Sequence, residues 1–96
     1  MPRVELAPGV VDDFDRILDH LEAHDVADAP SRIHEIIEAI QVLEASPHIG
    51  RPAGDDLREL VIGRRSRGYV ALYRYMAELE IVFVLAVRSQ REAGYR

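Results

Sequence analysis

Two stretches in the first half of the chain repeat apolar residues three and four positions apart, which is the spacing of one helix face. The first covers residues 10–24; the second starts after a capping residue, Asp28, has Pro30 in its first turn and runs to about residue 45. Five of the other positions in the first stretch are acidic. We expect them on its surface and, near its start, at the positive end of the helix dipole. The apolar stripes are Val10, Phe14, Ile17, Leu18 and Leu21, then Ile33, Ile36, Ile37, Ile40 and Leu43.

The second half of the chain changes to the pattern of β-strands. Residues 57–62, 69–76 and 81–88 are expected strands, separated by a basic turn and a shorter second turn. Short links favour antiparallel neighbours, so these strands predict a meander. The last strand is apolar on both faces and is expected to lie centrally. A further short strand is expected at residues 3–6, and the Pro- and Gly-rich stretch 46–56 is predicted to be a loop.

These elements predict an α+β fold with the order β-α-α-β-β-β. A helical hairpin would pack on one face of a sheet that contains a three-stranded antiparallel meander, and the other face would be partly open. The 96 residues suit one domain, residues 1–96, without an internal repeat or linker.

The composition indicates the cellular compartment in which the chain is expected to work. It contains no cysteine, which excludes disulfides and cysteine-based zinc sites and fits a reducing cytoplasm. The start of the chain lacks the apolar region of a signal peptide, and the apolar runs are too short to span a bilayer. We therefore expect a cytoplasmic protein that does not act at a membrane.

Charge is distributed unevenly along the chain. The net charge of −5 argues against a general nucleic-acid binder. Residues 1–50 contain 3 Arg and 11 Asp or Glu, whereas residues 51–96 contain 9 Arg and 6 Asp or Glu. The second half would therefore supply any face that meets an acidic or phosphate-rich partner. All basic residues are Arg, which makes forked contacts but does not exchange protons near neutral pH.

Four short motifs follow one another along the second half of the chain. They are Pro47-x-Ile49-Gly50-Arg51-Pro52, Leu57-Arg58-Glu59-Leu60, Gly68-Tyr69-x-x-Leu72-Tyr73-Arg74 and Val87-Arg88-x-Gln90-Arg91-Glu92-x-Gly94-Tyr95. Their order and spacing, together with the order of the elements over nearly the whole chain, resemble the RelE/ParE family of toxins. The resemblance implies the toxin component of a type II toxin–antitoxin system, which slows bacterial growth and is neutralised by a cognate antitoxin in a hetero-oligomer.

The family contains two mechanisms, and the residues present distinguish them. RelE-like members cut mRNA in the ribosomal A site, whereas ParE-like members inhibit DNA gyrase. RelE-like enzymes use a pair of Lys on the second strand, an Arg directly after Gly-Tyr, and an Arg and a Tyr near the C-terminus. This chain has no Lys, has Val70 after Gly68-Tyr69, and has no histidine beyond His48 to replace the missing base. We therefore predict a non-enzymatic toxin with DNA gyrase as its target.

Two other functions stay open at this point. One is a ribosome-dependent mRNA endonuclease, which would use Arg58, Arg88, Arg91 and Tyr95 as catalytic residues. The other is an inactive homologue that only binds a partner. An adjacent gene for a DNA-binding antitoxin would support the toxin assignment in either mechanism.

The predicted target-binding surface is the C-terminal segment 88–96 together with the basic turn. The segment follows an apolar strand that anchors it, and it carries Arg and Tyr, which are common at binding hot spots. Charge in the turn is equally compatible with simple solvation. The members of this surface are Arg88, Arg91, Tyr95, Arg64, Arg65 and Arg67. No cofactor or metal is expected.

Other polar side chains have a structural explanation beside a functional one. His20 and His24 lie four apart and could hold a metal, but a solvated helix flank is favoured because no third ligand is indicated. Arg58 and Glu59 belong either to the site or to cross-strand pairs. A tyrosine row on the middle strand could stack on bases, but it is more typical of a half-buried sheet face; its members are Tyr69, Tyr73 and Tyr75.

Overall fold

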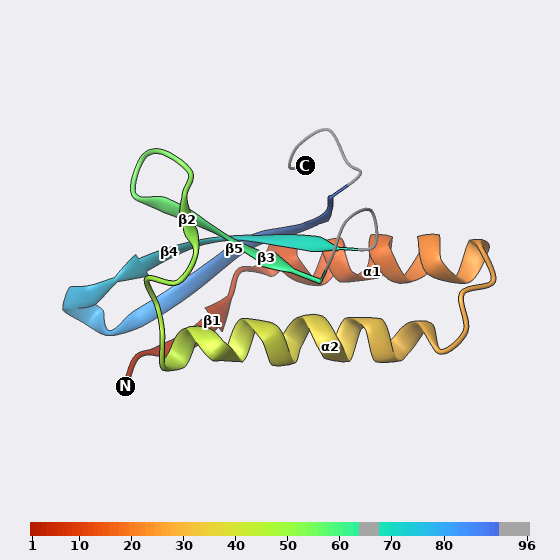
Figure 1. Cartoon of the computed structure of the whole chain (residues 1–96), viewed down its shortest axis with the longest axis horizontal. Helices are drawn as coiled ribbons and strands as arrows, with labels where there is room; N and C mark the ends of the chain where they lie inside the picture. The colour runs from red at the N-terminus through yellow and green to blue at the C-terminus, as the bar shows by residue number, and fades with distance from the viewer. Residues whose placement is uncertain (64–67, 91–96) are drawn as a thin grey trace.

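The strands of the sheet come from both ends of the chain. The computed structural model describes residues 1–63 and 68–90, which form, in order, β1 (Arg3–Leu6), α1 (Pro8–Ala23), α2 (Ala29–Gln41), the 3-10 helix η1 (Val42–Glu44), β2 (Arg51–Pro52), β3 (Leu57–Ile62), β4 (Tyr69–Met76), the 3-10 helix η3 (Ala77–Leu79) and β5 (Ile81–Ser89). The sheet order is β1-β5-β4-β3-β2 (Figure 1). The antiparallel meander β3-β4-β5 and the α+β fold class are confirmed.

β5 lies inside the sheet, between β1 and β4, which explains its apolar sequence. β1 runs parallel to β5, and such a pair needs a long connection, which here contains both helices and strands β2 to β4. The register pairs Arg3 with Ile81 and Leu6 with Val84. β1 therefore covers only the first part of β5. Beyond Val84, no strand among the described residues pairs with β5 on that side.

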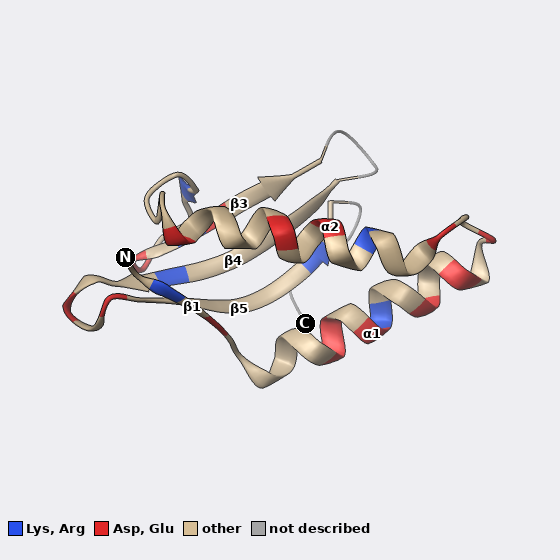
Figure 2. Cartoon of the chain, turned by 90° about the horizontal axis from the view of Figure 1, so that it is seen from below, with Lys and Arg blue, Asp and Glu red and all other residues tan. Residues whose placement is uncertain are grey.

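The two helices cover one face of the sheet (Figure 2). We call this the helix face and the opposite one the outer face. Alternate side chains of β4, such as Ala71 and Tyr73, point into the core under the helices, so that Val70 and Leu72 belong to the outer face. β3 and β5 also contribute to this core, and the predicted stripes supply its helical part, of which the most deeply buried members include Val10, Ile36, Ile40 and Leu43.

The start of α1 differs from the sequence prediction. The helix begins at Pro8 rather than at residue 10, since proline is tolerated in a first helical turn where no backbone N–H is needed. That turn contains no acidic residue, so the expected placement of acids at the positive end of the dipole is wrong. Asp13 also contradicts the expectation of a surface position, because only 6% of the residue is exposed.

Helix α2 starts directly after the predicted capping residue, Asp28, but the side chain of that residue does not cap it. Asp28 has a left-handed backbone, with φ of 56°. Its carboxylate instead accepts a hydrogen bond from the Ser31 hydroxyl at 2.6 Å. α2 ends at Gln41, and η1 continues the apolar stripe to Leu43.

The stretch predicted as a loop contains a short edge strand, β2. Arg51 pairs with Glu59 and Pro52 with Arg58. Proline is compatible with a strand here because β2 forms the edge of the sheet. The meander also carries an irregularity between Leu72 and Tyr73, where the register to β5 shifts by one residue. None of the described helices has the length and apolar character needed to cross a membrane.

Candidate functional site

Charged side chains from three strands meet on the outer face. The Arg51 Nε donates to Glu59 Oε1 at 3.1 Å, and the Arg88 Nη2 lies 3.9 Å from Glu59 Oε2. The side chains of Glu59 and Arg88 are only 16% and 17% exposed, whereas that of Arg51 is 59% exposed. We call these three residues the outer-face cluster. It combines two guanidinium groups with a single carboxylate between them.

The strand register explains this meeting. Arg51 and Glu59 are direct partners in the β2–β3 pair. Glu59 is opposite Leu72 on β4, and Arg88 is opposite Val70, two residues away on the same face of that strand. The cluster therefore spans β4, and the β4 residues opposite Glu59 and Arg88 are apolar. Of the two roles that the sequence left open for Glu59, its bond to Arg51 shows the cross-strand pair.

Arg58 lies on the opposite face, although it is adjacent to Glu59 in sequence. It is opposite Tyr73, and its Nη1 donates to the backbone oxygens of Gly50 at 2.7 Å and His48 at 3.2 Å. The structure thus separates Arg58 from Arg88. Of the other residues considered for a ribonuclease site, Arg91 and Tyr95 lie outside the described residues, as do Arg64, Arg65 and Arg67 of the basic turn.

The tyrosine row is part of the helix-face core, and Tyr69 and Tyr73 are buried more deeply than the half-buried sheet face favoured from the sequence. Tyr73 is fully buried; its hydroxyl donates to the Pro47 oxygen at 2.8 Å and accepts from the Gly50 N–H at 2.9 Å. Burial raises the pKa of the Tyr73 hydroxyl, while the Gly50 hydrogen bond and the Arg58 charge act in the opposite direction. Tyr73 and Arg58 together hold the chain at residues 47–50 against the sheet.

Gly50 is required by this close approach. A Cβ atom added there would lie 2.6 Å from both Cε1 and the hydroxyl oxygen of Tyr73, and 2.9 Å from the Glu59 backbone oxygen. Such distances are too short for a side chain without movement of the backbone. The loop motif and the two strand motifs that carry the family resemblance are therefore linked by direct contacts.

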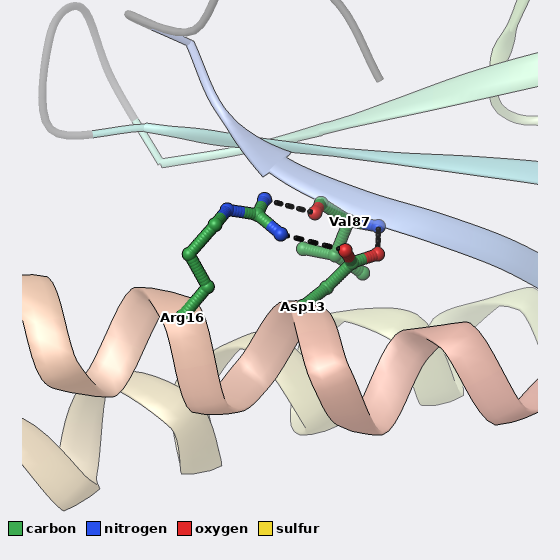
Figure 3. Close-up of polar contacts among 3 residues, drawn as sticks. All are labelled: Asp13, Arg16 and Val87. Atoms are coloured by element: carbon green, nitrogen blue, oxygen red, sulfur yellow. Dashed lines mark hydrogen bonds and ion pairs between the residues drawn. The ribbon is translucent and has the colours of Figure 1, made fainter. Parts of the chain in front are cut away.

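An interaction that sequence reasoning missed joins α1 to β5 (Figure 3). The Asp13 carboxylate accepts from the Val87 N–H at 2.9 Å and from Arg16 Nη1 at 2.7 Å, while Arg16 Nη2 donates to the Val87 oxygen at 3.3 Å. Val87 lies beyond the end of β1, so two side chains replace a strand at this edge of β5. The sequence did contain a signal, since Asp13 is spaced three residues from Val10 and four from Ile17 on the apolar stripe.

His20 and His24 form a local contact on α1. Their ring centroids are 4.3 Å apart, and His24 Nδ1 is 2.9 Å from the His20 backbone oxygen. Within residues 1–63 and 68–90, no three His, Cys, Asp or Glu side chains gather closely enough to hold a metal ion. The favoured interpretation of this pair as a helix flank fits their exposure.

Comparison with known proteins identifies the family. A family model described as "ParE toxin of type II toxin-antitoxin system, parDE" matches residues 4–94. The chain therefore belongs to the ParE toxin family. Comparison with curated protein sequences gives no match.

Solved structures share the fold of this ParE-family chain. The chromosomal ParDE toxin–antitoxin system from P. aeruginosa includes a chain with a TM-score of 0.76 and 22% identity, covering 93% of this chain and 96% of that one. The intact E. coli RelBE toxin–antitoxin complex gives 0.60 and 17%, covering 96% and 100%. The isolated E. coli RelE toxin gives 0.60 and 17%, covering 97% and 88%. Similarity to both ParE and RelE structures confirms the predicted fold, and the family match agrees with the preference for a ParE-like toxin.

Charge separates the layers of this ParE-family chain. Figure 2 shows acidic residues spread along α1 and α2, while most blue segments lie on the strands. The uneven charge of the two halves of the sequence thus becomes an unevenness between helices and sheet. Arg88 is the member of the predicted target-binding surface that falls within the described residues, and it lies on the outer face, away from the acidic helices.

Proposed function

We propose that this chain is a growth-inhibiting toxin that binds a protein target, DNA gyrase, and does not cut RNA. A cognate antitoxin would neutralise it by forming a hetero-oligomer with it. The family match supports the toxin assignment, and two of the similar structures are a toxin–antitoxin system and a toxin–antitoxin complex.

The positions of Arg58 and Arg88 carry the choice of mechanism. RNA cleavage needs cations, a base and an acid around one phosphate. Arg58 binds two backbone oxygens on the helix face, whereas Arg88 faces Glu59 on the outer face. The chain also has no Lys, and Val70, which follows Gly68-Tyr69, is 1% exposed. These observations favour binding over nucleolytic chemistry.

The target-binding surface is proposed to lie around Arg88 and the segment that follows it. Arg88 is held at the end of a strand that is anchored in the core, so its position is fixed before any partner binds. The remaining members would be Arg91, Tyr95, Arg64, Arg65 and Arg67. An antitoxin segment with acidic groups near this arginine-rich half would complement its charge.

Growth assays test the toxin assignment. Expression of this chain alone is expected to slow bacterial growth, and co-expression with the protein encoded by the adjacent gene is expected to restore it. Normal growth at confirmed high levels of soluble protein would contradict the assignment and favour an inactive homologue.

Two in vitro assays test the mechanism. DNA supercoiling by gyrase should be inhibited, or cleaved gyrase–DNA complexes should accumulate, while transcripts in a translating extract stay intact. Cuts at defined codon positions that disappear in Arg88→Ala would establish the endonuclease instead.

Paired substitution of Arg91 and Tyr95 by Ala tests the binding surface. Toxicity should fall while the melting temperature is retained. Toxicity lost only together with the fold would indicate a structural role, and toxicity retained with a normal fold would remove these residues from the site.

A further inference from the structure

The geometry of the outer-face cluster points to a role for Glu59. This residue uses its two carboxylate oxygens for different cations, with Oε1 toward Arg51 and Oε2 toward Arg88. The cations come from β2 and β5, on either side of the β3–β4 pair. One internal carboxylate therefore faces both guanidinium groups.

Without that carboxylate, the outer face would be well suited to phosphate. Arginine binds phosphate oxygens by paired hydrogen bonds, and limited solvent exposure strengthens such contacts. Arg88 is mostly buried, and the β4 residues between it and Glu59 in register, Val70 and Leu72, are apolar. A phosphodiester approaching Arg88 would meet the negative charge of Glu59 and compete with it for the same donors.

We propose that Glu59 is a specificity-determining residue that excludes nucleic-acid phosphates from the outer face. A protein partner can contact this face with neutral or apolar groups and leave the cluster intact, whereas a nucleic acid approaches with phosphates. The inference rests on the proposed function, because it explains how an arginine-bearing surface would select a protein target.

The test compares two substitutions that remove the same charge. Glu59→Gln keeps the size of the side chain and an oxygen acceptor for Arg51. Glu78→Gln, in the turn between β4 and β5, is the matched control. Binding of a short fluorescein-labelled single-stranded RNA to each full-length variant is measured by anisotropy over a range of salt concentrations.

Glu59→Gln is expected to bind the RNA on the order of tenfold more tightly than the unsubstituted chain, with a steeper dependence on salt. Glu78→Gln should bind like the unsubstituted chain. Adding Arg88→Gln to Glu59→Gln should reverse the gain. Unchanged binding in Glu59→Gln, equal gains in both single variants, or a gain that survives loss of Arg88 would each overturn the inference.

Thermal unfolding of each variant shows whether the fold is retained. If Glu59→Gln does not fold, Glu59→Thr, which suits a strand, replaces it with the same expected gain. These binding measurements are separate from the growth and supercoiling assays on the unsubstituted chain. RNA binding gained by Glu59→Gln would support the inference even if gyrase proves not to be the target. Inhibition of supercoiling by the unsubstituted chain, with no gain of RNA binding in Glu59→Gln, would contradict this inference and leave the proposed function standing.

Discussion

The helix face and the outer face of the sheet use polar residues in different ways. On the helix face, Tyr73 and Asp13 are buried and bond to backbone groups of neighbouring segments. In the outer-face cluster, ion pairs join side chains to one another, Arg88 also donates to the Ser89 backbone oxygen at 3.2 Å, and Arg51 stays largely exposed. Backbone-directed contacts in the core fix the fold, whereas side-chain pairs near the surface can be rearranged by a partner.

The same residue type illustrates this difference. Arg58 donates to two backbone oxygens and acts as part of the loop attachment. Arg88 instead lies beside a carboxylate at the end of β5. The comparison predicts that substitutions on the helix face mainly reduce stability, while substitutions on the outer face mainly change binding.

The largest loss of stability is expected for Asp13→Ala. This change leaves the buried N–H of Val87 and the Arg16 guanidinium without their carboxylate, which should cost about 3 kcal/mol in the free energy of unfolding. Urea unfolding measures it. Asp12→Ala, an exposed neighbour on α1, is the control and should change stability by no more than about 0.5 kcal/mol. Equal small effects would contradict the structural role of Asp13.

Tyr73→Phe should reduce stability by about 2 kcal/mol. The substitution keeps the ring but leaves Gly50 N–H and the Pro47 oxygen without their partner. Tyr75→Phe on the same strand is the matched control and should cost less, since Tyr75 is only partly buried. A loss in Tyr75→Phe as large as that in Tyr73→Phe would show that the hydroxyl bonds to the loop are not what matters.

Arg88→Ala and Arg58→Ala should separate toxicity from stability. Arg88→Ala is expected to lower growth inhibition while the fold is retained, because Glu59 keeps its shorter contact with Arg51 at 3.1 Å. Arg58→Ala should lower stability more, because it releases the loop at Gly50. Growth curves and urea unfolding of both variants check this. Full toxicity in a folded Arg88→Ala variant would remove Arg88 from the target-binding surface.

The smallest expected effect is a dependence of stability on alkaline pH. Burial raises the pKa of the Tyr73 hydroxyl above its ordinary value of 10.0. The folded chain therefore holds this proton more tightly than the unfolded chain does. The contribution of this proton to the free energy of unfolding is complete below about pH 10 and is lost as the pH rises through the folded-state pKa. Urea unfolding between about pH 9 and pH 11 should show a steeper decline in the unsubstituted chain than in Tyr73→Phe; parallel declines would contradict this.

The sequence alone predicted the larger elements because their signals are local. The helical stripes, the three strands of the meander and the first short strand follow from spacing that neighbouring residues define. It did not predict β2, whose two residues have no periodicity of their own and pair only because β3 is already in place. The early start of α1 was missed because Pro8-Gly9 is typical both of a turn and of a first helical turn.

The candidate site was predicted only in part. Arg88 was predicted to be functional because it follows the apolar residues of the last strand, although it lies within β5, and Glu59 was left between a site and a cross-strand role. The face on which each arginine lies depends on register, because a shift of one residue moves a side chain to the other side of the sheet. Sequence therefore grouped Arg58 with Arg88, and the register separates them.

By itself, then, the sequence determined the element types, their order, the family resemblance and the contrast between an acidic and a basic half. Tertiary structure decided which distant groups meet: Asp13 with Val87, Tyr73 with Gly50, and Glu59 with Arg88. Periodicity is a property of neighbouring residues, so it survives in a sequence without its fold. A contact between residues far apart along the chain depends on strand order, register and the end of β1, and these exist only once the whole sheet has formed.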